Sequence, residues 1–270
     1  MLEYAFKLKA VEARKIFSER ILKASVFAGY LMLANGAETA RVEETIERIL
    51  SSAGFKNVGI FVSFTSIITG FDDEQGNAKT MIKRVGSRGY NLSKIAKIND
   101  ISRSYVSKEI TLDDVEQKLS EVENEKGYPM MAKTLASAIA CFCFSYMLGQ
   151  NVVAAANAFF IGIIVSILML GLSSKNLSPY LITLAAGCAI SSVAVLFVHL
   201  GLNQFDSIDI AIIGSILPYL PGIAMTNAIR DIFCGNYVSG ICRGLEAVFI
   251  ALCLSAGVGT ILGIYMFYIA

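Results

Sequence analysis

The sequence predicts a mainly α-helical membrane protein. An N-terminal cytoplasmic α+β domain of helices and a β-hairpin is followed by a five-helix transmembrane bundle with a broken fourth span. Mean hydropathy is +0.60 and 55% of the 270 residues are hydrophobic, which is high for a soluble domain. Residues 1–127 hold 19 of the 23 Lys and Arg and 18 of the 22 Asp and Glu residues. Residues 128–270 hold five apolar stretches of about 20 residues, so the boundary is predicted between these two ranges.

The first half is predicted to be a small α+β domain. Residues 8–34 have the apolar spacing of one long amphipathic helix, which ends at Asn35-Gly36 because glycine readily closes a helix. A second helix covers "ETARVEETIERIL". The strand-like stretches "NVGIFVSFTSIIT" and "NAKTMIKRV" are joined by the turn-rich "GFDDEQGN", which predicts a hairpin. Two more helices are expected at about 91–105 and 111–125, the latter capped by Thr111.

The second half is predicted to cross the membrane five times, because each apolar stretch approaches or exceeds the length of about 20 residues that spans the hydrocarbon core. The predicted spans are about 131–148, 152–172, 179–201, 208–228 and 242–268. Five is an odd number, so a second unit of this kind would run inverted, as in many secondary transporters. A single five-span unit therefore implies a partner subunit or a homo-oligomer.

The charges between the spans predict the orientation. Lys175 lies between spans two and three, and Arg230 and Arg243 flank the link between four and five, whereas Asp206 and Asp209 lie between three and four. Basic loops stay on the cytoplasmic side. The N-terminus also lacks the features of a secretory signal. We therefore expect a multi-pass protein of the bacterial inner membrane, with its N-terminus in the cytoplasm and its C-terminus outside.

The fourth span is predicted to be broken. Pro218 and Pro221 remove backbone donors and Gly222 loosens the chain. A helix that restarts after Gly222 offers free N–H groups, and transporters place substrates at such breaks. Arg230 and Glu246 are ionisable groups near membrane depth, with Asp231 or each other as expected partners. A simple proline kink with charged interfacial anchors is the alternative, and the residues alone leave both open.

Several function classes are disfavoured. The first half has no His or Cys, which excludes the usual Ser-His and Cys-His nucleophilic pairs, and no phosphate-binding loop is present. No catalytic residue, cofactor or metal site is therefore expected. Both halves are nearly neutral, which gives no reason to expect nucleic-acid binding. His199 and the six cysteines fit a structural role better than a ligand role.

Two stretches resemble the motifs of the threonine/serine exporter family. "LANGAETARVEETIERIL" is similar to its Gly-Ala-Glu-(Ser/Thr) motif, and "LPGIAMTNAIRDIFCGNYVSGICRGLEA" is similar to its Pro-Gly-x-Pro-x-x-Asn-Ala-x-x-Asp motif, with Ala224 at the second proline. "SRGYNLSKI" adds a third match. The length is most like the larger subunit (YjjP type) of the split form, which pairs with a small membrane subunit (YjjB type). The resemblance implies export of threonine and serine or of succinate, driven by the proton-motive force.

The resemblance also implies site residues. In the first half the motif positions are Gly36, Ala37, Glu38, Arg41 and Glu43. In the membrane half, Pro221 and Gly222 form the break, and Arg230 or Arg243 is expected to hold a substrate carboxylate. Asn227 and Ser239 are expected to bind a hydroxyl or amine of the substrate. Asp231 or Glu246 is expected to couple transport to protons.

The hypothesis from the sequence is thus a subunit of a secondary exporter for small carboxylate-bearing metabolites, embedded in the lipid bilayer. The alternative is a non-transporting membrane scaffold or sensor whose cytoplasmic domain is the working part. A scaffold has no reason to place a Pro-Gly break beside charged residues within a span.

Overall fold

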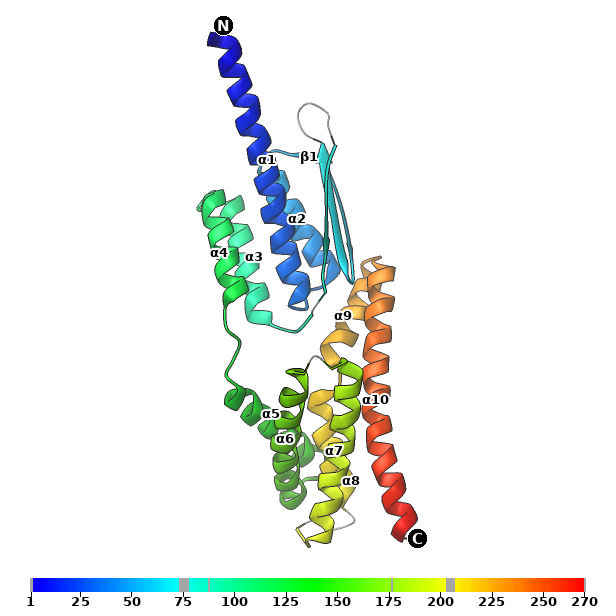
Figure 1. Ribbon diagram of the computed structural model, residues 1–270. Coiled ribbons are helices and arrows are strands. Elements are labelled where there is room, and N and C mark those ends of the chain that lie inside the picture. Colours follow the sequence, from blue (N-terminus) through cyan, green and yellow to red (C-terminus); the bar gives the residue numbers. More distant parts are fainter. Residues whose placement is uncertain (1, 73–77, 87, 176, 203–206, 270) are drawn as a thin grey trace. The chain divides into compact units, whose positions relative to one another are not determined.

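The computed structural model describes residues 2–72, 78–86, 88–175, 177–202 and 207–269 (Figure 1). The chain divides into two compact units. The first, which we call the N-terminal unit, comprises Met1–Lys126 together with Ala224–Gly244. The second, the bundle unit, comprises Gly127–Ile223 and Leu245–Ala270. A segment that is distant in sequence therefore completes the N-terminal unit.

The N-terminal unit begins with helices that agree with the predicted ones. They are α1 (Leu2–Ala34), α2 (Thr39–Ser52), α3 (Leu92–Val106) and α4 (Leu112–Asn124). The helix end predicted at Asn35-Gly36 is confirmed. So is the Thr111 cap, since its side chain accepts the Asp114 N–H while the Asp114 side chain accepts the Thr111 N–H.

The β structure has one strand more than the predicted hairpin. Strands β1 (Lys56–Ser63), β2 (Ser66–Asp72) and β3 (Ala78–Arg84) form an antiparallel sheet in the order β1-β2-β3. The stretch "NVGIFVSFTSIIT", predicted as a single strand, turns back at Phe64-Thr65. The Ser63 and Ser66 hydroxyls lie 2.7 Å apart across this turn, which lacks the glycine or proline that would have revealed it. Residues 73–77, within the predicted turn "GFDDEQGN", lie outside the described residues.

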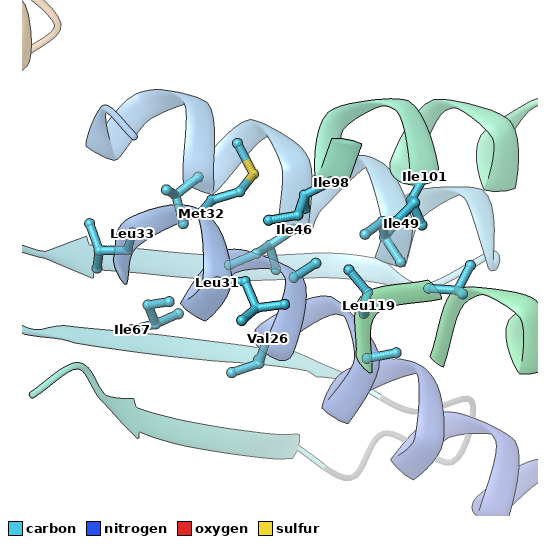
Figure 2. Close-up of a cluster of buried hydrophobic side chains, with 14 of the residues drawn as sticks. Val26, Leu31, Met32, Leu33, Ile46, Ile49, Ile67, Ile98, Ile101 and Leu119 are labelled. Carbon is cyan, nitrogen blue, oxygen red and sulfur yellow. The ribbon is translucent and has the colours of Figure 1, made fainter. Parts of the chain in front are cut away.

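The core of the N-terminal unit is made of large aliphatic side chains. Figure 2 shows them converging from the end of α1, from α2, α3 and α4, and from the sheet. Ile21, Met32, Ile46, Leu50 and Leu119 have no solvent exposure. Burial of apolar area contributes roughly 25 cal/mol per Å², so this cluster is the main source of stability of the unit.

The distant segment of this unit, Ala224–Gly244, contains most of α9 (Gly222–Phe233) and the start of α10 (Tyr237–Ile269). Gly235, with a φ of 85°, lies in the link between them. A Cβ added at Gly240 would lie 2.6 Å from the Ile232 side chain and 2.8 Å from the Ala228 carbonyl oxygen. Glycine is therefore required where α10 runs closely past α9.

The bundle unit contains most of the apolar helices. They are α5 (Met130–Gly149), α6 (Val152–Ser173), α7 (Pro179–His199), α8 (Ile208–Ile216) and the short 3-10 helix η2 (Leu217–Tyr219), followed by the rest of α10. Among the described residues, four helices are long and apolar enough to cross a membrane, and five spans result if Ile208–Tyr219 and Gly222–Phe233 form one broken span. The predicted break is confirmed at Leu220-Pro221. The loop residues 203–206, including Asp206, lie outside the described residues.

The interior of the bundle unit combines small residues with aliphatic side chains such as Ile161, Ile190 and Leu254, while many other large apolar side chains face outward. Ala154, Ala158 and Ser145 are fully buried, whereas Phe160 and Leu181 are more than half exposed. An added Cβ at Gly187 of α7 would lie 2.3 Å from the Leu254 carbonyl oxygen, and one at Gly257 of α10 would lie 2.3 Å from that of Leu184. Such close backbone contacts between small residues are typical of helix packing in membranes.

The close contact of α7 with α10 predicts that Gly257→Ala destabilises the protein, because overpacking of a tight contact costs about 1–3 kcal/mol. The temperature of unfolding in detergent should fall. Gly259→Ala on the same helix is the matched control, because no described atom lies within 4 Å of its added Cβ. Equal unfolding temperatures for the two variants would contradict the contact.

Candidate functional site

The stretches singled out from the sequence meet in a buried polar cluster within the N-terminal unit. One side of the cluster is residues 36–39, which comprise the end of the loop between α1 and α2 and the first residue of α2. The other side is formed by α9 and the start of α10. Asn227 Nδ2 donates a 2.9 Å hydrogen bond to the Gly36 carbonyl, and Arg243 Nη2 donates a 3.2 Å bond to the Ala37 carbonyl. The two motifs, separated by about 190 residues, therefore form one site.

The loop owes its shape to Gly36. Its φ of +90° lies in the left-handed region that favours glycine. The N–H of Gly36 bonds to the Leu33 carbonyl and that of Ala37 to the Met32 carbonyl, as at many helix ends. An added Cβ at Gly36 would lie 2.5 Å from the Tyr90 ring. Tyr90 belongs to the "SRGYNLSKI" stretch, so that stretch supports the loop from behind.

α9 carries the opposite side of the cluster on one face. Its buried residues, Ala224, Asn227, Ala228 and Asp231, follow the three- and four-residue spacing of a helix face. Met225, Ile229 and Phe233 on the other side are exposed. Asn227 and Asp231 therefore point into the protein, whereas the large apolar groups of α9 and Arg230 point out.

Asp231 is the centre of the cluster and is 1% exposed. Its Oδ1 accepts the Thr39 N–H at 3.0 Å, and its Oδ2 accepts the Thr39 hydroxyl at 3.1 Å and the Ser239 hydroxyl at 3.3 Å. Thr39 is the first residue of α2, where backbone N–H groups lack partners within the helix. A carboxylate at this positive helix end is favoured electrostatically.

Arg243 supplies the opposite charge. The guanidinium is 3% exposed, and its Nε lies 3.3 Å from Asp231 Oδ2. The Nε–H does not point at that oxygen and has no hydrogen-bond partner among the described residues. The contact is therefore an ion pair without a well-aligned hydrogen bond at Nε. The Phe64 ring, 5.5 Å from the guanidinium carbon, covers the cation.

The remaining charged motif residues lie around the cluster. Arg230 forms an ion pair with Glu38, whereas Asp231 or Glu246 was the expected partner. The Arg230 side chain is 55% exposed, so this pair contributes about 0–1 kcal/mol. Arg41 is exposed and lies on the outer side of α2.

Glu43 is a half-buried carboxylate beside the cluster. Its Oε1 accepts the Val62 N–H of β1 at 3.1 Å, and the Asn236 side chain also hydrogen-bonds to it. Burial raises the pKa of Glu43 above its ordinary value and outweighs these two bonds, while the nearby Asp231 charge raises the pKa further. Glu43 therefore links α2, the sheet and the turn between α9 and α10.

Not all predicted site residues join the cluster. Pro221, Gly222 and Glu246 belong to the bundle unit. Gly222 starts α9 and Arg230 lies near its end, so their backbone positions are about 12 Å apart along the helix axis. The helix N-terminus in the cluster is that of α2. Among the described residues, no three His, Cys, Asp or Glu side chains are placed to hold a metal ion.

Thr39, Phe64 and Asn236 were missed as site residues. Thr39 stands at the Ser/Thr position of the first motif, so the motif itself could have identified it. Phe64 lies in the unpredicted turn of the sheet, and Asn236 follows the Gly235 turn. No local signal in the sequence identified either as part of a site.

Comparison with known proteins decides the family. The family model described as "Putative threonine/serine exporter" matches residues 23–265. The chain belongs to this exporter family. The match includes both motifs and confirms the resemblance seen in the sequence. As an exporter-family member with four to five candidate spans in the part that the structure describes, the chain is a multi-pass membrane transport protein and not an enzyme.

Two curated relatives of this exporter chain align over nearly their full length. The "Probable succinate transporter subunit YjjP" of Klebsiella aerogenes is 23% identical over 92% of this chain and 95% of its own. The protein of the same name from Escherichia coli K12 is 24% identical over 88% of this chain and 92% of its own. No solved structure matches the chain.

Glu43 predicts a pH dependence of the exporter chain's stability. The folded protein holds the Glu43 proton more tightly than the unfolded chain, so this contribution to stability is present below the ordinary glutamate pKa and is lost as pH rises through the raised value. Glu43→Gln stays neutral and can still accept the Val62 N–H. The difference in unfolding temperature, Glu43→Gln minus the parent, should therefore increase as the pH is raised from about 4 to about 8.

The matched control for this measurement is Glu12→Gln, because Glu12 is exposed on α1. Its difference from the parent should stay flat with pH. A flat difference for Glu43→Gln as well would show that burial does not perturb this carboxylate.

Proposed function

We propose that this chain is one subunit of a secondary exporter in a bacterial inner membrane, with the N-terminal unit facing the cytoplasm. The exported compounds are small carboxylate-bearing metabolites, either threonine and serine or a dicarboxylate such as succinate. The observation that carries this proposal is the buried cluster around Asp231, in which the two motifs of an exporter family supply ion-binding groups to one place.

The cluster has the chemistry for a small, polar anion. Arg243 is a buried cation whose Nε–H makes no hydrogen bond among the described residues. Thr39 and Ser239 contribute hydroxyls, and the start of α2 contributes a backbone N–H. A guanidinium and a helix N-terminus together favour carboxylates. We assign Arg243 to the substrate carboxylate, and Asn227 and Ser239 to a substrate hydroxyl or amine.

A partner completes the transporter in this proposal. The curated relatives are named as subunits, and the described residues of this chain supply at most five candidate spans. Secondary transporters commonly combine two inverted units around one site. We assign the second unit to a small membrane subunit of the YjjB type or to a second copy of this chain. In this proposal the Pro221-Gly222 break lets the fourth span move, with Arg230 on the helix that follows the break. The motif residues Gly36, Ala37, Glu38, Arg41 and Glu43 belong to the cytoplasmic part of the subunit.

Exchange of labelled threonine, serine and succinate in proteoliposomes tests the function. The chain is reconstituted alone and with its co-purified membrane partner. We expect exchange of at least one compound and dependence on the partner. The preferred label then identifies the substrate class. Absence of exchange for all three compounds from a folded complex would instead support the scaffold or sensor.

Proton coupling is tested with the amide variants Asp231→Asn and Glu246→Gln. A carboxylate that carries the coupled proton cannot be replaced by an amide. At least one variant should lose substrate accumulation driven by a pH gradient while it keeps substrate exchange at equal pH. Asp209→Asn is the control, because Asp209 is exposed at the start of α8. Full coupling in both variants would exclude these two carboxylates.

A further inference from the structure

We propose that Thr39, Ser239 and Arg243 form a carboxylate-binding site that Asp231 occupies as an internal ligand, and that the exported substrate binds by displacing Asp231. The part that concerns the substrate rests on the proposed function. The part that concerns the site rests on the contacts of Asp231 alone.

The donors around Asp231 match the needs of a carboxylate from any source. Oδ1 accepts a backbone N–H from Thr39, and Oδ2 accepts hydroxyl groups from Thr39 and Ser239 beside a guanidinium. The N–H and the hydroxyls stand within 3.3 Å of the carboxylate oxygens and belong to other helices than Asp231. An aspartate side chain ends in the same group as acetate, formate or succinate. A free carboxylate can therefore take the same position once the side chain is gone.

The donors are not fully used by Asp231. The Nε–H of Arg243 is buried and makes no hydrogen bond among the described residues, although Asp231 Oδ2 is 3.3 Å away. The Thr39 and Ser239 hydroxyl oxygens lie 2.6 Å apart. Each hydroxyl has a single proton, which it can donate either to Asp231 Oδ2 or to the other hydroxyl. A buried donor without a partner lowers stability. A ligand carboxylate that accepts hydrogen bonds from all the donors of the site, including the Arg243 Nε–H, would remove this loss of stability.

Asp231 is placed so that it can leave. It lies on α9, a helix of 12 residues between two non-helical links, Leu220-Pro221 before it and the Gly235 turn after it. Short links of this kind absorb the backbone changes of a hinge. Two negative carboxylates repel each other at one small site. Entry of a substrate carboxylate therefore requires Asp231 to move out, which removes the contact of α9 with Thr39 and leaves the Asn227–Gly36 and Arg230–Glu38 contacts to hold it.

The experiment is chemical rescue of Asp231→Ala by formate. The substitution removes the carboxylate and keeps Cβ, so it leaves a space of the size of formate. We measure the unfolding temperature of the full chain, co-purified with any partner, in sodium formate and in sodium chloride of equal concentration. We expect Asp231→Ala to unfold at a lower temperature than the parent and to be restored by formate in a saturable way, but not by chloride.

Matched variants define the site. Asp209→Ala removes an exposed carboxylate elsewhere and should show no formate-specific shift. Ser239→Ala added to Asp231→Ala should weaken the apparent formate affinity about tenfold, because a hydrogen bond to a charged group is lost. Equal effects of formate and chloride would overturn the proposal. So would failure to recover folded Asp231→Ala in formate, because the free carboxylate then does not replace the missing one.

A second measurement covers the case in which the alanine variant does not fold. Asp231→Asn keeps the size of the side chain, but the neutral amide interacts more weakly with the Arg243 guanidinium than the carboxylate does. Calorimetric titration with succinate should therefore give tighter binding to Asp231→Asn than to the parent, by at least severalfold. Unchanged or weaker binding would overturn displacement.

The two proposals fail separately. Rescue by formate without any transport in proteoliposomes would retain the site and reject the exporter. Transport without rescue or tighter binding would retain the exporter and reject Asp231 as an internal ligand.

Discussion

The buried carboxylate of Asp231 is held by donors from other helices, and a buried charge of this kind persists only while those donors stay in place. The start of α2, the helix α9 and the start of α10 are thereby all held by one carboxylate. If any partner moved away, an uncompensated charge would remain inside the protein. The loop at residues 36–39 and α9 are therefore positioned together.

Two glycine turns give the backbone the geometry that this contact needs. Gly36 ends α1 so that the Gly36 and Ala37 carbonyls face Asn227 and Arg243. Gly235 ends α9 so that α10 returns past it, with Gly240 at the closest approach. Backbone conformations open mainly to glycine thus determine where the polar side chains meet.

The same residues stabilise the N-terminal unit and offer groups that recognise an anion. Buried polar networks that are fully satisfied rigidify a fold, whereas a partly satisfied network lowers stability because a buried donor lacks a partner. The cluster here is of the second kind, because the Arg243 Nε–H lacks a partner among the described residues. Family membership gives this feature a context, since an exporter must bind its substrate and then let it go. The glutamate beside the cluster, Glu43, connects the network to the sheet.

The sequence alone determined the features that depend on local chemistry. The apolar stretches predicted the membrane helices, Asn35-Gly36 and Thr111 predicted helix ends, and the prolines predicted the break after η2, because each signal acts on its own stretch of backbone. The tertiary structure decided the pairing of groups. Thr39 lies 192 residues from Asp231, and no local rule selects one partner among the many polar groups of the chain. The turn at Phe64-Thr65 also escaped prediction, because it has no glycine or proline and is imposed by the pairing of β1 with β2. Partners distant in sequence are chosen by packing, which depends on the whole fold.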